Sequence, residues 1–164
     1  MKELLSQYAS YNLWANNELL KQVLTLTDQQ QQQEIESSFP SIRLTVFHIW
    51  DAESIWWQRL KLQEQIIRPS GSTNMPMTEI ANGWQQQSKT WTDWIANAND
   101  PQLDHVFAYQ NSKREQFKQP VYQMLLHLFN HGTYHRGQLI TMLRQVGANK
   151  ITSTDFILWS RNKK

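Results

Sequence analysis

The residues of this chain with the clearest capacity for chemistry are three histidines, His127, His131 and His135, which follow one another at intervals of four. In an α-helix, residues four apart share a face and lie about 6 Å apart along the axis, so two such imidazoles can converge on one metal ion at bond lengths of roughly 2.0–2.1 Å. A third in line cannot join them, because the outer two are about 12 Å apart. The spacing therefore predicts a metal site that uses two of the three.

The apolar residues around these histidines decide which pair it is. When each residue is advanced by about 100° around the helix, His135 falls within the apolar stripe and His131 at its edge, whereas His127 lies on the outer shoulder. The stripe consists of Val121, Met124, Leu125, Leu128, Leu139, Met142, Leu143 and Val146. We therefore predict that His131 and His135 are the metal ligands on this helix.

A third ligand must come from elsewhere, because two buried imidazoles need a partner for their polar nitrogen atoms. The chain has no cysteine, so the choice is limited to His, Asp, Glu and neutral oxygen donors. His48 is the candidate, since it lies in a segment with apolar residues on nearly every face, whereas His105 lies in a polar stretch and is expected at the surface. Three neutral histidines leave a coordination position open, which is typical of catalytic sites. The alternative is that the histidines are core residues that hydrogen-bond to their neighbours.

Long helices must position these side chains, and apolar residues at three- and four-residue intervals predict four of them. Their expected ranges are 2–26, 42–65, 78–97 and 120–146. We expect Ser41 and Thr78 to cap the second and the third helix, Pro120 to lie in the first turn of the fourth, and Gly147 to end it.

The segments between these helices are predicted from their composition. The glutamine run 29–33 is expected to be a solvated connector or a helix end, and residues 68–76 to form a loop. A short β-hairpin over residues 106–118 is expected before the last helix, and the tail 151–160 is apolar enough to pack back on the helices. The fold class is therefore all-α: one domain over residues 1–164, a four-helix bundle with one crossover loop and a short hairpin.

Composition excludes several classes of function. The chain has 164 residues, with 16 basic and 14 acidic ones and a formal net charge of +2, and it carries no block of like charges. We therefore expect no nucleic-acid partner. No apolar run approaches the length of a membrane span, and the N-terminal segment lacks the apolar core of a signal peptide, so we expect a cytoplasmic protein without a membrane partner. The tryptophans at helical spacing are expected in the core or at a dimer interface rather than around a substrate cavity.

Four segments together resemble one known family. The stretch from His127 to Gln138, HLFNHGTYHRGQ, resembles the C-terminal metal motif of the DinB/YfiT-like family. Residues 11–16 resemble its N-terminal signature, residues 48–56 the segment with its first metal histidine, and residues 154–156 its closing motif. The match spans almost the whole chain in order. One departure is Tyr134, where many relatives carry another histidine, so a role assigned to that position in them does not transfer to this chain.

The resemblance implies a four-helix bundle that binds one divalent metal ion through His48, His131 and His135. Zn²⁺ and Ni²⁺ are the favoured ions, although imidazole ligands also suit other transition metals. Relatives include transferases and isomerases that use small thiols, and many members are described as metal-dependent hydrolases. The resemblance therefore favours a small-molecule substrate, a low-molecular-weight thiol among the candidates, and a homodimer.

The leading hypothesis is an enzyme, a metal-dependent hydrolase or a thiol S-transferase. Asp51, one turn from His48, is the candidate for a proton shuttle, with orientation of His48 as its alternative role. We expect Arg136 to point away from the buried stripe and to have a structural role, with a subunit contact as one setting for it, and Gln138 to face the bundle, where it could line the pocket. Two other hypotheses stay open: a non-catalytic metal-binding or stress-response protein, and a helical interaction module without metal.

Overall fold

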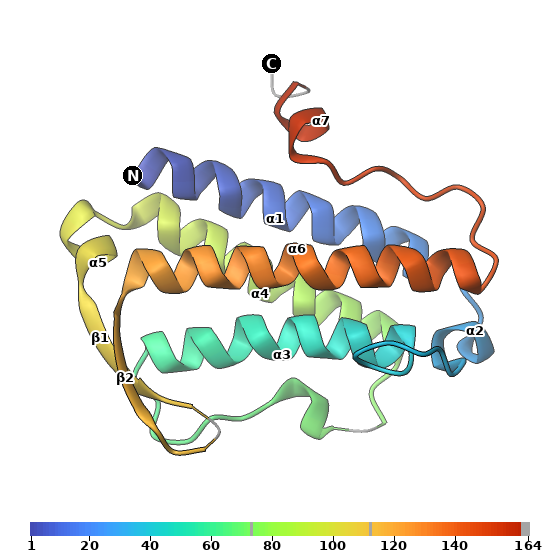
Figure 1. Ribbon diagram of the computed structural model, residues 1–164, viewed down its shortest axis with the longest axis horizontal. Helices are drawn as coiled ribbons and strands as arrows, with labels where there is room; N and C mark the ends of the chain where they lie inside the picture. The colour runs from blue at the N-terminus through green and yellow to red at the C-terminus, as the bar shows by residue number, and fades with distance from the viewer. Residues whose placement is uncertain (73, 112, 162–164) are drawn as a thin grey trace.

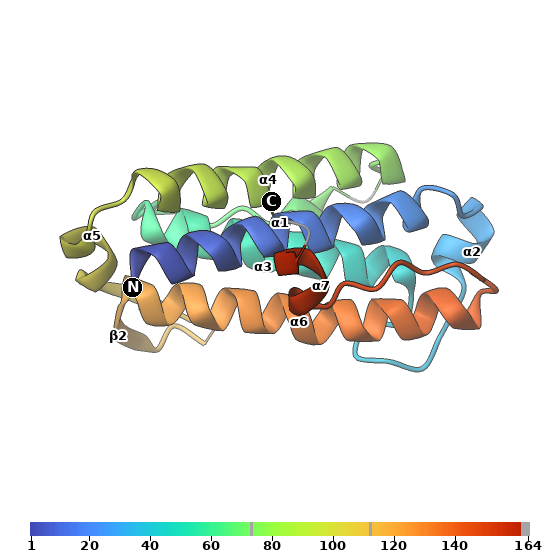
Figure 2. The same cartoon turned by 90° about the horizontal axis from the view of Figure 1, so that it is seen from above.

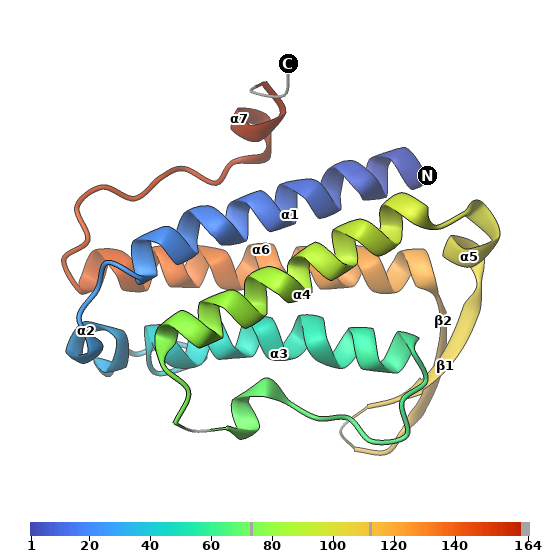
Figure 3. The same ribbon diagram turned by 180° about the vertical axis from the view of Figure 1, so that it is seen from behind.

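Four long helices packed side by side dominate the computed structural model, which describes residues 1–72, 74–111 and 113–161 (Figures 1 and 3). They are α1 (Lys2–Val23), α3 (Ile42–Leu60), α4 (Met77–Asn97) and α6 (Val121–Gln145). Both α1 and α3 contact both α4 and α6. Because α3 and α4 run in the same direction, the segment between them travels back along the whole bundle (Figure 1). The predicted four-helix bundle with one crossover connection is confirmed.

Short elements connect and cover these helices. A small helix α2 (Asp28–Gln32) follows α1, a 3₁₀ turn η1 (Pro69–Gly71) lies on the crossover, and α5 (Asp100–Asp104) follows α4. The predicted hairpin is present, with β1 (Val106–Gln110) antiparallel to β2 (Gln116–Pro120). The tail folds back as predicted: α7 (Phe156–Arg161) lies against α1, where Phe156 and Trp159 contact the ring of Tyr11 (Figure 2).

Two of the predicted helix ends are confirmed. Ser41 caps α3, because its side chain accepts a hydrogen bond from the backbone nitrogen of Leu44. Gly147 follows the C-cap of α6 with φ of +89°, a conformation that favours glycine.

Other expectations about element ends were wrong. Helix α4 begins at Met77 after Pro76, so Thr78 lies inside the helix and does not cap it. Pro120 ends β2 and precedes α6 rather than lying in its first turn. For the glutamine run the helix-end alternative holds: residues 29–32 are the last four of α2, whose start is fixed by a reciprocal capping box between Thr27 and the third helical residue. Within the described ranges, no helix combines the length and hydropathy that a membrane span requires.

A layer of buried polar side chains divides the core across the middle of the bundle. One apolar cluster lies toward the hairpin and includes Leu5, Ile95 and Leu125. A second lies toward α2 and includes Val23 and Val46. Each long helix places at least one buried polar side chain between the two clusters, and these residues are Asn12, Asn16, Asp51, Glu53, Ser88, His135 and Arg136. The chemistry-bearing residues of the chain therefore gather at one level of the fold.

Candidate metal centre

Three histidines meet at this level between α3 and α6. We call them the histidine triad: His48 on α3, and His131 and His135 on α6. Nε2 of His48 lies 3.1 Å from Nε2 of His131 and 3.1 Å from Nε2 of His135. One potential ligand atom from each of the three side chains lies within 4.8 Å of the others. The structure thus brings together the residues that helical periodicity and the family resemblance selected.

The spacing of these nitrogen atoms fits the coordination shell of a metal ion. Bonds of roughly 2.0–2.1 Å place two ligand nitrogens about 3.4 Å apart at a tetrahedral angle and about 2.9 Å apart at a right angle. The observed separations of 3.1 Å from His48 lie between these values. In a cluster held by hydrogen bonds alone, a proton on Nε2 of His48 could be fully donated to only one neighbour, whereas a cation attracts all three lone pairs at once.

Gln138 determines which nitrogen of His135 carries the proton. Its Oε1 lies 2.8 Å from Nδ1 of His135, and a carbonyl oxygen can only accept, so Nδ1 is the donor. Neutral His135 therefore presents the lone pair of Nε2 to the other two histidines. Nε2 of Gln138 donates to Oγ of Ser38 at 2.8 Å and to the hydroxyl of Tyr134 at 3.1 Å, and these bonds hold the amide in place. Gln138 faces the site as expected, and the structure gives it an orienting contact.

Aromatic rings cover part of the triad. The ring of Phe39 stacks on His48, with centroids 3.9 Å apart and an interplanar angle of 22°, and it meets the edge of His135. The exposed ring of Tyr134 meets His135 edge to face, with ring centroids 4.9 Å apart. His135 is only 5% exposed, but His48 and His131 are half-buried, so the triad is not sealed from solvent. Sequence analysis did not single out Phe39, because a phenylalanine before Pro-Ser carries no signal beyond a helix start.

Burial keeps the triad in the neutral form that binds metal. It is the largest cause that lowers the pKa of His48 from 6.5 to about 4, with the charges of His135 and Arg68 adding to the shift. The pKa of His131 also falls from 6.5 to about 4, first through burial and then through the neighbouring histidines. Burial lowers the pKa of His135 as well, against the hydrogen bond to its amide partner, which raises it. Only neutral imidazole binds a metal ion, so no proton has to be displaced at neutral pH.

Three other candidates from the sequence lie outside the triad. Asp51 is buried, and its two carboxylate oxygens accept hydrogen bonds from the backbone nitrogen of Ser70 at 2.9 Å and from Oγ of Ser70 at 2.5 Å. The carboxylate thus ties η1 to α3, and its role as a proton shuttle stays a prediction. His127 is exposed and contacts the rings of Trp56 and His131 as a neighbour of the site. His105 is exposed at the end of α5, as expected.

Arg136 has a structural role, as predicted, but within the single chain. We suggested a subunit contact as the setting for that role, whereas the side chain is only 2% exposed in the single chain. Its Nη1 donates to Oδ1 of Asn12 at 2.6 Å and to Oδ1 of Asn16 at 2.8 Å, both on α1. The expectation was wrong because α6 packs against α1 as well as α3, so its buried face is wider than its apolar stripe.

A buried carboxylate completes this polar layer. Oε1 of Glu53 accepts hydrogen bonds from Asn12 at 2.9 Å and Asn16 at 3.1 Å, and Oε2 accepts one from Ser88 at 2.7 Å. Burial raises the pKa of Glu53, while its hydrogen bonds from Ser88, Asn12 and Trp84 and the charge of Arg136 oppose the rise. The network joins all four long helices beside the triad. An acidic residue in a helix that is apolar on nearly every face was the available signal for it, and sequence analysis missed it.

The chain is thus a four-helix-bundle protein in which three histidines from two helices converge on a candidate metal site. The sequence model of the DinB family matches residues 1–161, and the chain belongs to that family. It is 30% identical over 146 residues to protein DinB of Bacillus subtilis (strain 168), a match that covers 84% of this chain and 83% of the relative.

Solved structures agree on the fold. A DinB-like protein from Bacillus subtilis superposes with a TM-score of 0.68 at 15% sequence identity, over 91% of this chain and 98% of the other. A DinB-like protein from Bacillus cereus ATCC 10987 gives a TM-score of 0.64 at 20% identity, over 85% of this chain and 89% of the other. At these identities the likeness concerns the fold alone.

Proposed function

We propose that this DinB-family protein binds one divalent transition-metal ion through Nε2 of His48, His131 and His135 and acts as a metal-dependent enzyme on a small molecule. The observation that carries the proposal is the convergence of three neutral imidazoles, two of them 3.1 Å from the third. Zn²⁺ and Ni²⁺ are the favoured ions, because imidazole is a good ligand for both. The reaction class is hydrolysis or transfer of a group to a small thiol.

The residues around the site have different roles in such an enzyme. The three histidines supply neutral ligands, and the half-buried positions of His48 and His131 leave a side for substrate. When bound, the ion lowers the pKa of a water ligand or binds the sulfur of a thiol cosubstrate. Gln138 keeps the lone pair of His135 on Nε2. The hydroxyl of Tyr134 lies beside this amide and is the candidate for a hydrogen bond to substrate.

Elemental analysis of untagged protein tests metal binding. We expect about one ion per chain in the wild-type protein and loss of the ion in His131→Ala and His135→Ala. His127→Ala is a matched control, because it removes an imidazole from the same helix at the same spacing, and it should retain the ion. Full metal content in the first two variants would contradict the assignment.

Turnover tests catalysis. Metal-loaded protein should hydrolyse members of an ester panel or couple a small thiol to an electrophile, and His131→Ala should lose that activity. A non-catalytic metal-binding protein is the second candidate, favoured by the stacking of Phe39 over His48 at 3.9 Å. Cobalt-substituted protein separates the two, because a thiol that enters an open coordination position produces a sulfur-to-cobalt charge-transfer band. An unchanged spectrum together with no turnover would support the second candidate.

The homodimer and the cytoplasmic location stay predictions. Exposed apolar side chains on the outer faces of the bundle, such as Leu4 on α1 and Leu126 on α6, are compatible with an interface. Sedimentation equilibrium of the purified protein tests the dimer: a mass twice that of the chain is expected, and a monomer mass at high concentration would contradict it.

A further inference from the structure

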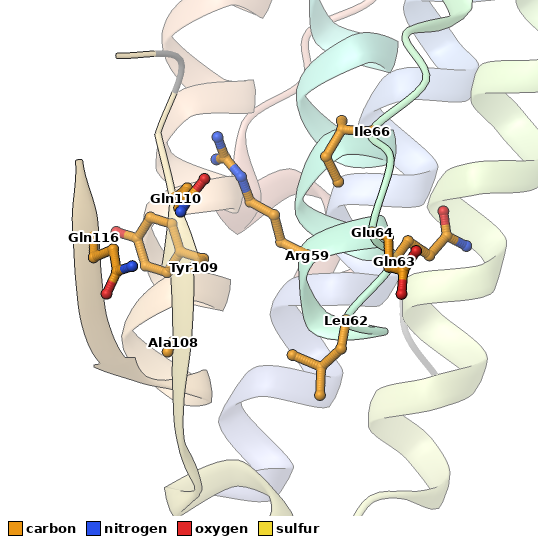
Figure 4. Close-up of a pocket in the computed structure, with 9 residues that line it drawn as sticks. All are labelled: Arg59, Leu62, Gln63, Glu64, Ile66, Ala108, Tyr109, Gln110 and Gln116. Atoms are coloured by element: carbon orange, nitrogen blue, oxygen red, sulfur yellow. The ribbon is translucent and has the colours of Figure 1, made fainter. Parts of the chain in front are cut away.

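A cavity of about 390 Å³ lies at the hairpin end of the bundle (Figure 4). It is lined by the end of α3, the segment that follows α3 and the β1–β2 hairpin, and no histidine of the triad takes part. Arg59 is the cationic side chain of its wall. Arg59 is three turns from His48 on α3, about 16 Å along the helix axis, so the cavity is a place distinct from the candidate metal centre.

Aromatic rings hold the guanidinium of Arg59 in the cavity. Its Cζ lies 4.7 Å from the ring centroid of Trp56 and 5.3 Å from that of Tyr109, and these two rings meet edge to face. In Figure 4 the side chain extends from α3 toward β1, while Gln63 and Glu64 lie on the far side of the end of α3. Stacking on ring faces leaves the N–H edge of a guanidinium available for a planar acceptor.

That edge has no partner in the part of the chain that the structure describes. Nε of Arg59 is buried and makes no hydrogen bond there. Neither of the ion pairs Lys21–Glu18 and Lys89–Asp93 involves Arg59, and within the described ranges its guanidinium forms no ion pair with a carboxylate. Burial lowers the pKa of Arg59, as does the charge of Arg68, while Tyr109 raises it. A guanidinium stays protonated in proteins, so this wall of the cavity carries a partly desolvated, uncompensated positive charge.

We propose that this cavity is a binding site for a small organic carboxylate, which forms charge-assisted hydrogen bonds with Arg59. The side chains of Leu62 and Ile66 and the ring of Tyr109 supply an apolar wall for the body of the ligand, and Gln110 and Gln116 supply amides for its polar groups. The planar guanidinium can form two parallel hydrogen bonds with a carboxylate group. The site goes beyond the proposed function, because it needs neither the metal ion nor a residue of the triad.

Isothermal titration calorimetry of metal-loaded, full-length protein tests the site. The probe is hippurate, which joins a carboxylate to an amide and an apolar ring, and the neutral comparison is hippuramide. We expect saturable binding of hippurate and binding of hippuramide that is weaker by about tenfold or more, which is the effect of a lost charge-assisted hydrogen bond. Arg59→Met should weaken hippurate binding by a similar factor of about ten or more.

Three further variants complete the test. Arg144→Met removes the same charge from the exposed last turn of α6 and should leave hippurate binding within about twofold, since surface charges at a distance are screened. Arg59→Lys keeps the charge without the planar fork, so its affinity should fall between those of wild type and Arg59→Met. His131→Ala should bind hippurate like the wild type whether or not it still holds metal, which separates this proposal from the proposed function.

The proposal is overturned by any of four results. The first is the absence of saturable hippurate binding, and the second is equal hippurate affinity in Arg59→Met and the wild type. The third is hippurate binding that is lost in His131→Ala but retained in Arg59→Met. The fourth is tighter binding of inorganic phosphate than of hippurate. Circular dichroism of each variant shows whether it is folded. If Arg59→Met is unfolded, the comparison of Arg59→Lys with Arg144→Met decides.

Discussion

Replacing Gln138 by leucine removes the acceptor that holds Nδ1 of His135 at 2.8 Å. Without it, neutral His135 is free to carry its proton on Nε2, where the lone pair is needed for the metal ion. Loss of such an outer hydrogen bond commonly weakens metal affinity by about 10- to 100-fold, or roughly 1.4–2.8 kcal/mol. We expect a loss of zinc affinity in this range, and not a larger one, for Gln138→Leu. The amide of Gln138 is only half-buried, so Nδ1 of His135 keeps some access to solvent in the variant.

Competition titration against a chromophoric zinc chelator at neutral pH measures this effect. Gln138→Glu is the matched replacement, because a carboxylate accepts from Nδ1 at least as well as an amide, and it should hold or raise the affinity. Ser38→Ala and Tyr134→Phe remove only the partners of the other end of the amide and should change the affinity by less than about threefold. Unchanged zinc affinity in Gln138→Leu, with affinity lost in His135→Ala, would refute the orienting role.

Three further predictions concern stability. Two histidines of the triad have a pKa of about 4 in the folded protein and of 6.5 when unperturbed, so the unfolded chain binds more protons between these values. The free energy of unfolding of metal-free protein should therefore be highest above about pH 7 and fall as the pH is lowered toward 4; urea titrations that give a constant value over this range would contradict it. A Cβ on Gly83 would lie 2.2 Å from the ring of Trp50, so Gly83→Ala should cost about 1–3 kcal/mol in chemical denaturation. Gly137→Ala, whose Cβ would meet no atom within 4 Å, should instead stabilise α6 by up to about 1 kcal/mol. Equal effects of the two substitutions on stability would contradict the close packing of Gly83 against Trp50. Glu53→Ala leaves its buried donors without their acceptor and removes the negative charge near the Arg136 guanidinium, so denaturation should show a loss of about 3–5 kcal/mol. A loss below about 1 kcal/mol would show that the polar layer is dispensable.

Local sequence patterns were sufficient for the parts of this protein that depend on one helix. The four-residue spacing and the apolar stripe selected His131 and His135 over His127, because helical geometry alone decides which of them face inward. His48 required the family resemblance, since nothing in its own helix distinguishes a ligand from a core histidine. The hairpin, the Ser41 cap and the Gly147 helix end were also predictable from local chemistry.

Contacts between helices could not be predicted from these local sequence patterns. Arg136 was misplaced because its burial depends on the packing of α1 against α6, and two asparagines one turn apart on α1 show their purpose only when a guanidinium faces them. Phe39 reaches the triad from a loop whose path the sequence does not encode in any periodic pattern. The cavity at Arg59 likewise requires the hairpin to fold against the end of α3, which brings together residues about 50 positions apart in the chain.

Anomalous diffraction from crystals of the zinc-loaded protein, recorded on both sides of the zinc absorption edge, shows directly whether the histidine triad binds the ion. We expect one strong peak between α3 and α6, at roughly 2.0–2.1 Å from Nε2 of His48, His131 and His135. A zinc peak held elsewhere, such as at the exposed His127 or at surface carboxylates, with none among the three Nε2 atoms, would contradict it.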